Sequence, residues 1–104
     1  MASSFRTRLD RAARAGKMTT ADLSAWFARP YPTVRGWRLN PHHYVPWGPD
    51  GEEAQRLLKV LETAIERKLR FPVPFHLSPL NRRRYVLRMR HELDGELPAA
   101  RATR

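Results

Sequence analysis

The 104-residue chain contains no cysteine, which excludes disulfide bonds and cysteine-ligated metal sites. No apolar run approaches the ~20 residues that a membrane-spanning helix needs. The N-terminal segment 1–17 carries arginines but lacks the apolar block of a secretory signal. Acidic residues are also scarce, because 10 Asp and Glu stand against 20 Lys and Arg, for a net charge of +10. This imbalance favours a polyanionic partner, with nucleic acid ahead of an anionic membrane surface.

Sequence signatures of catalysis are missing too. The chain has no P-loop, no glycine-rich dinucleotide turn and no cysteine nucleophile. His42 and His43 suggest a metal site, but adjacent residues seldom converge on one ion and no nearby acidic pair completes a ligand set. We therefore expect no enzyme activity, no cofactor and no metal.

Apolar residues recur at helical spacing along most of the chain, which predicts a single all-α domain over residues 1–104. A first helix is expected from about Ser4 to Ala15, with a serine cap and Gly16 after its end. A second starts near Thr19, where Thr19 and Asp22 have the spacing of a capping box. The predicted divisions are a helix-turn-helix region 1–38, a loop 39–50, a long amphipathic helix 51–70, a connector and basic helix 71–95, and a mobile tail 96–104.

The stretch Ala21–Asn40 places two prolines between two helical segments. Proline is tolerated in the first turn of a helix and disfavoured in its interior, so we expect Pro30 to end one helix and Pro32 to open the next. Leu23 and Phe27 lie one turn apart on the first helix. The same holds for Val34 and Trp37 on the second. Two short helices that cross steeply would bury these four side chains against each other.

The segment "LSAWFARPYPTVRGW" resembles the helix-turn-helix of phage and bacterial DNA-binding proteins. Ala28 occupies the place where such turns usually have glycine. The resemblance covers about residues 19–38. It implies a protein that recognises double-stranded DNA by sequence, acts as a phage or prophage transcriptional regulator, forms a homodimer or higher homo-oligomer, and works in the bacterial cytoplasm or nucleoid.

The second helix of such a motif enters the major groove with its N-terminus first. If Val34 and Trp37 face the core, Tyr31, Thr33 and Arg35 remain to contact bases, and Arg35 can bind the O6 and N7 atoms of a guanine. The expected contacts to the DNA backbone are Thr19, Thr20, Arg29, Arg38, Arg82, Arg83 and Arg84.

Two features of the C-terminal half leave other functions open. The helix predicted over 51–69 has a wide apolar stripe that suits packing on the helix-turn-helix, a dimer seam, or both. Between Arg67 and His91 eight Lys and Arg residues occur without an acidic residue, which indicates a second phosphate-contacting surface or a solvated helix face. The alternatives are a DNA-packaging or architectural protein of the small-terminase kind, and an adaptor that binds a protein through the 51–69 helix.

Overall fold

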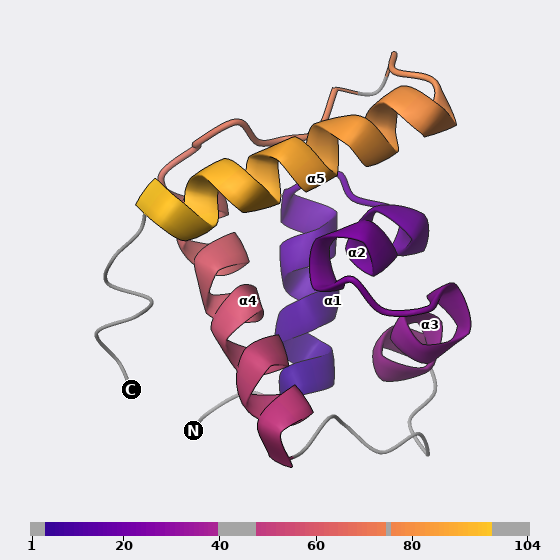
Figure 1. Cartoon of the computed structure of the whole chain (residues 1–104), viewed down its shortest axis with the longest axis vertical. Helices are drawn as coiled ribbons and strands as arrows, with labels where there is room; N and C mark the ends of the chain where they lie inside the picture. The colour runs from indigo at the N-terminus through magenta and orange to yellow at the C-terminus, as the bar shows by residue number, and fades with distance from the viewer. Residues whose placement is uncertain (1–3, 40–47, 75, 97–104) are drawn as a thin grey trace.

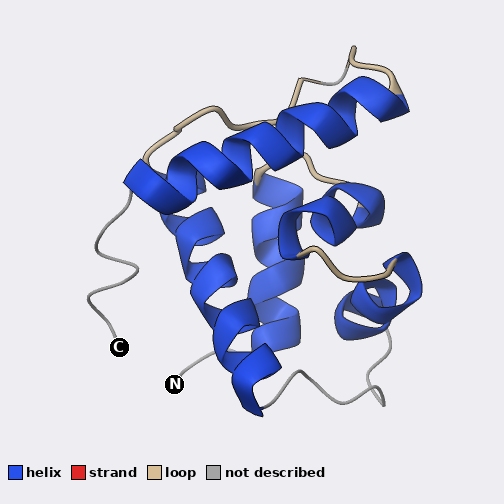
Figure 2. Cartoon of the chain, in the orientation of Figure 1, coloured by secondary structure: helices blue, strands red, loops and turns tan. Residues whose placement is uncertain are grey.

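The computed structural model describes residues 4–39, 48–74 and 76–96. This part of the chain is helical and contains no strand, which confirms the all-α prediction (Figure 2). Helix α5 lies across one end of the others, and α3 lies on the far side of the molecule from α4 (Figure 1). The helices are α1 (Phe5–Ala15), α2 (Thr20–Phe27), α3 (Tyr31–Leu39), α4 (Gly48–Glu66) and α5 (Pro79–Glu96).

Side-chain caps fix where three of the helices begin. The Ser4 hydroxyl accepts a hydrogen bond from the backbone N–H of Thr7 at the start of α1. Thr19 and Asp22 form the predicted capping box of α2, with each side chain bonded to the other residue's backbone N–H. The Ser78 hydroxyl accepts from the N–H of Asn81 at the start of α5. Each cap satisfies an N–H group that has no partner inside the helix.

Helices α1 and α4 end in the same way, with a lysine in the left-handed conformation. Lys17 has φ 56°, and its N–H bonds to Arg14 while that of Met18 bonds to Ala13. Lys68 repeats this pattern at the end of α4. Paired bonds of this kind satisfy the last carbonyls of a helix and turn the chain sharply.

The predicted range 51–70 for the long helix was wrong at both ends. Helix α4 begins three residues earlier, at Gly48, because a proline is tolerated in the first turn and Pro49 lies there. It ends at Glu66 because Lys68 leaves helical geometry. Residues 48–50, expected in the loop, are therefore helical. In α5, Gly95 does not end the helix, which continues to Glu96. Residues 40–47, with His42 and His43, and 97–104 of the predicted tail lie outside the described residues.

The core is built around α2, which contacts α3, α4 and α5. The fully buried Trp26 donates its indole N–H to the carbonyl of Leu57 on α4, at 3.0 Å. Gly16 allows α1 to pack closely against the end of α4 and the chain after it, because a Cβ there would lie 3.1 Å from both Ile65 and Phe71. The largest fully buried side chains are Trp26, Phe27, Leu9, Leu23, Leu57, Leu58, Leu61, Met89, Leu93, Val34, Val60 and Val73.

Candidate nucleic-acid interface

The turn between α2 and α3 is three residues long. Ala28 adopts the left-handed conformation (φ 55°, ψ 46°), and the Ser24 hydroxyl donates to the carbonyl of Arg29 at 2.6 Å. The carbonyl of Pro30 accepts from the N–H groups of Thr33 and Val34, so α3 begins at Tyr31, one residue before the expected start at Pro32. The turn therefore holds α3 against α2 through backbone and hydroxyl bonds.

One face of α3 is anchored in the core, as the sequence predicted. Val34 is fully buried and Trp37 is 6% exposed. The Trp37 ring meets the rings of Phe5 and Phe27 edge-on, with centroids 5.8 and 5.7 Å away. An aromatic cluster from α1, α2 and α3 thus fixes the rotation of α3 about its own axis.

The opposite face of α3 is open to solvent. Tyr31, Arg35 and Leu39 follow one another at four-residue spacing, and all three are exposed. Arg35 has no hydrogen bond or ion pair within the described part of the chain. Thr33 is half-buried, and its offset of two residues from both Tyr31 and Arg35 places it on a different side of α3. Of the three residues expected to contact bases, Tyr31 and Arg35 therefore share one exposed face, and Thr33 does not lie on it.

The residues near α2 that were expected to contact the DNA backbone are partly engaged within the protein. The Thr19 hydroxyl belongs to the capping box, and that of Thr20 accepts from Arg38 at 3.2 Å. The Arg29 guanidinium lies 3.9 Å from the carboxylate of Glu53 on α4. Arg29 thus links the turn to α4 while remaining partly exposed.

Arg38 joins α3 to α1. Its Nε lies 3.0 Å from one carboxylate oxygen of Asp10, whose other oxygen lies 2.8 Å from Nε of Arg14. Partial burial alone would raise the pKa of Asp10, but the hydrogen bonds from Arg38 and Arg14 outweigh it and lower that pKa. The Arg38 side chain is only 15% exposed and is paired with Asp10, so it contributes to the packing of α3 on α1 in addition to any contact with a ligand.

The three consecutive arginines of α5, Arg82–Arg84, have different environments in the fold. Arg82 contacts the buried carboxylate of Asp22 through Nε at 3.3 Å and Nη2 at 2.5 Å, and it also donates to the carbonyls of Pro74 and Lys17. The bond to Asp22 raises the pKa of Arg82. Arg83 and Arg84 are exposed and have no partner among the described residues. Only these two of the three side chains are available to a ligand.

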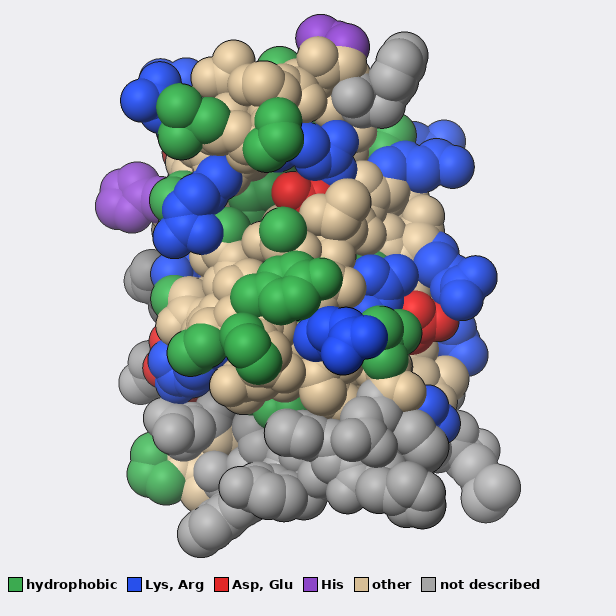
Figure 3. All heavy atoms as spheres, turned by 90° about the vertical axis from the view of Figure 1, so that its right-hand side faces the viewer, with side chains coloured by type: hydrophobic (Ala, Val, Ile, Leu, Met, Phe, Trp, Pro, Cys, Tyr) green, Lys and Arg blue, Asp and Glu red, His purple; other side chains and the backbone are tan. Residues whose placement is uncertain are grey.

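Acidic side chains are largely consumed in ion pairs. Six of them pair with arginines, namely Asp10, Asp22, Glu53, Glu62, Glu92 and Asp94. Nine basic side chains of the described ranges have no such partner, namely Arg6, Arg11, Lys17, Arg35, Lys59, Arg67, Lys68, Arg83 and Arg84. The face that carries α3 shows Lys and Arg side chains among hydrophobic ones, with little acidic surface between them (Figure 3). The exposed charge is therefore mainly positive.

Sequence reasoning missed the part of this surface that α1 supplies. Arg6, Asp10 and Arg14 lie at four-residue spacing, which places them on one face of the helix. That spacing was a usable signal, although it did not reveal that Arg38 would approach the same face.

Over residues 4–39, 48–74 and 76–96, no three potential ligands of a metal ion come together. None of the described helices has both the length and the apolar character needed to cross a membrane. Comparison of the chain with known protein families, curated proteins and solved structures finds no match.

Proposed function

We propose that the protein binds double-stranded DNA by sequence, with α2, the turn and α3 acting as a helix-turn-helix, and that it is a transcriptional regulator of the phage or bacterial type. The observation that carries the proposal is the division of α3 into two faces. Val34 and Trp37 hold one face in the core, and Arg35 stands on the other beside Tyr31, with no partner among the described residues.

In the proposed complex α3 lies in the major groove with its N-terminus leading. Arg35 donates two hydrogen bonds to the O6 and N7 atoms of a guanine, which contributes about 1–3 kcal/mol of discrimination against other bases. Tyr31, at the first position of α3, contacts a neighbouring base or its sugar. Arg83 and Arg84 bind phosphates without reading sequence, since the start of α5 lies near α2 (Figure 1).

The adaptor hypothesis is less well supported. It needs a free apolar face on α4, but the apolar stripe of that helix is buried within the chain itself, and each of these residues is at most 4% exposed: Ala54, Leu57, Leu58, Val60, Leu61 and Ala64. A regulator and a packaging protein both remain compatible with the surface. They differ in stoichiometry, because a dimer suits a regulator and a ring of many subunits suits packaging.

The test is selection of duplexes from a random pool, followed by binding measurements on the best site and on random DNA. Arg35→Ala should weaken binding to the best site by about 1–3 kcal/mol and change binding to random DNA little. Arg84→Ala is the matched control, since it also removes one exposed positive charge that has no partner in the described part of the chain, and it should weaken both duplexes alike. Failure of the wild-type protein to bind any duplex at low salt would refute the proposal.

A further inference from the structure

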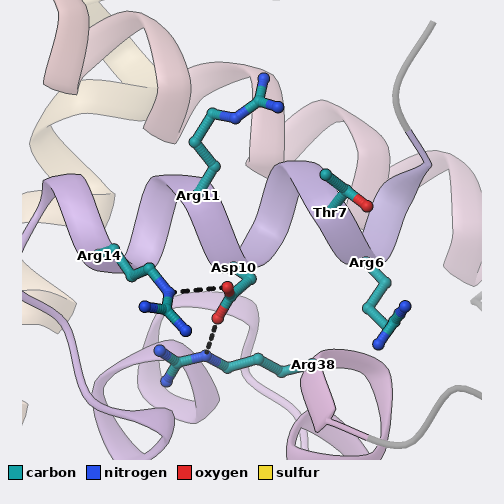
Figure 4. Close-up of a pocket in the computed structure, with 6 residues that line it drawn as sticks. All are labelled: Arg6, Thr7, Asp10, Arg11, Arg14 and Arg38. Carbon is teal, nitrogen blue, oxygen red and sulfur yellow. Dashed lines mark hydrogen bonds and ion pairs between the residues drawn. The ribbon is translucent and has the colours of Figure 1, made fainter.

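An open recess of about 370 Å³ lies between α1 and α3, lined by Arg6, Thr7, Asp10, Arg11, Arg14 and Arg38. Four arginines and one aspartate give this recess a formal charge of 4 − 1 = +3. Arg6 and Arg14 point down from α1 on either side of Asp10, and Arg38 extends from α3 beneath Asp10 toward Arg14 (Figure 4). Arg11 points away from α3.

Asp10 positions two of these arginines without using up their donors. It accepts one hydrogen bond from the Nε of each, at 2.8 Å from Arg14 and 3.0 Å from Arg38. Both Nη groups of Arg14 and Nη2 of Arg38 have no hydrogen-bond partner within the described ranges. Two guanidinium groups are thus held in place with free N–H groups at their outer ends, an arrangement that suits an oxyanion.

No contact among the described residues indicates that Arg6 stabilises the fold. Its side chain is exposed and has no partner in the part of the chain that the structure describes. It lies in the first turn of α1, where a positive charge opposes the helix dipole. A cation in this place is explained better by a ligand than by folding.

We propose that this recess binds a phosphate group of the DNA backbone through Arg6, Arg14 and Arg38, with Asp10 as the residue that positions the last two. The assignment to DNA rests on the proposed function. Arg38 stands three residues after Arg35 on the same helix, so its Cα lies about 4.5 Å further along the helix axis than that of the residue proposed to read a base. A strand that borders the groove occupied by α3 would pass this recess.

The test compares Arg6→Ala/Arg14→Ala with Lys59→Ala/Arg67→Ala. The second variant removes the same charge from exposed residues outside the recess that have no partner within the described ranges. Affinity for a random-sequence duplex is measured by fluorescence anisotropy over a range of salt concentrations. The recess variant should bind roughly 10-fold more weakly than the control variant, and its salt slope should be shallower by about 1 for each phosphate that the recess no longer binds. Both variants should melt close to the wild-type temperature. The single variant Arg6→Ala, which removes no interaction among the described residues, should show part of the same weakening.

Equal weakening in the two double variants would overturn the recess proposal and leave DNA binding itself intact. If the wild-type protein does not bind DNA, the proposed function is refuted, and the recess proposal is refuted with it. A second measurement tells whether the ligand of the recess is DNA or free phosphate. The Nε–Hε signals of Arg14 and Arg38 are followed by NMR, first with inorganic phosphate and then with duplex. Shifts that need the duplex support the proposal, whereas saturation by micromolar phosphate alone would assign the recess to free phosphate.

Discussion

Replacement of Arg82 by alanine should destabilise the protein strongly, although its neighbours in the run Arg82–Arg84 are dispensable for folding. The Arg82 guanidinium is the partner of Asp22, whose side chain is 4% exposed, and it bridges α5 to the start of α2. Without Arg82, the backbone N–H of Thr19 is the donor that remains to the carboxylate among the described residues. A buried charge left unpaired in this way is unfavourable because the interior cannot replace its hydration.

Removal of one partner from a fully buried ion pair costs about 3–5 kcal/mol. The Arg82 side chain is 15% exposed, so water can reach part of the site, and we expect a decrease of about 2–4 kcal/mol in the free energy of unfolding. For a domain of this size each kcal/mol shifts the melting temperature by roughly 4–8 °C, so the midpoint should fall by about 8–32 °C.

Thermal melting followed by circular dichroism measures the effect, with Arg83→Ala as the control from the same helix. The double variant Arg82→Ala/Asp22→Asn should lose less stability than the two single variants added together, because the second change removes the unpaired charge. If Arg82→Ala and Arg83→Ala melt together, the ion pair with Asp22 does not stabilise the protein and the reasoning is refuted.

Three further changes test other parts of the structure. Trp37→Ala should lower the free energy of unfolding by about 3–5 kcal/mol in urea titrations, because it empties the aromatic cluster with Phe5 and Phe27; unchanged stability would mean that α3 is rotated otherwise. Ala28→Gly should stabilise the protein by about 0.5–1 kcal/mol, since relief of the left-handed conformation exceeds the entropy that glycine adds to the unfolded chain; a lower melting temperature would contradict this. Asp10→Asn should cost about 0.2–1 kcal/mol at neutral pH. The pKa of Asp10 is lower in the folded protein than its usual 3.8, so this stabilisation exists above that value and disappears as the pH falls through the lowered pKa; a difference that persists in acid would rule out the ion pairs as its source.

Most helix boundaries could be predicted because their causes are local. Ser4, Thr19 and Ser78 cap helices through bonds to residues three positions away, and such spacing is visible in the sequence. The end of α1 at Ala15 was also predicted, from Gly16 directly after it. The end of α4 was not, since Lys68 has a left-handed conformation that lysine rarely adopts.

The candidate site was also predictable only where its features depend on local spacing. The exposure of Arg35 follows from the spacing of Val34 and Trp37, which is visible in the sequence. The separation of Arg82 from Arg83 and Arg84 depends on Asp22, 60 residues away, and the recess depends on Arg38 meeting Asp10 across 28 residues. Identical side chains in one run acquire different roles through tertiary interactions that no local pattern encodes.

The hydrogen bond from Trp26 to Leu57 bears on how the α2–α3 pair could be used in protein engineering. The indole N–H of Trp26 is buried and its acceptor belongs to α4, so a fragment that stops after α3 would leave this donor without its acceptor and expose the ring. The same fragment would lack Arg82, the partner of Asp22 in α2. Grafts or fusions that aim to transplant this pair of helices onto another scaffold should therefore carry α4 and α5 as well, because the two short helices depend on the rest of the chain for their interior.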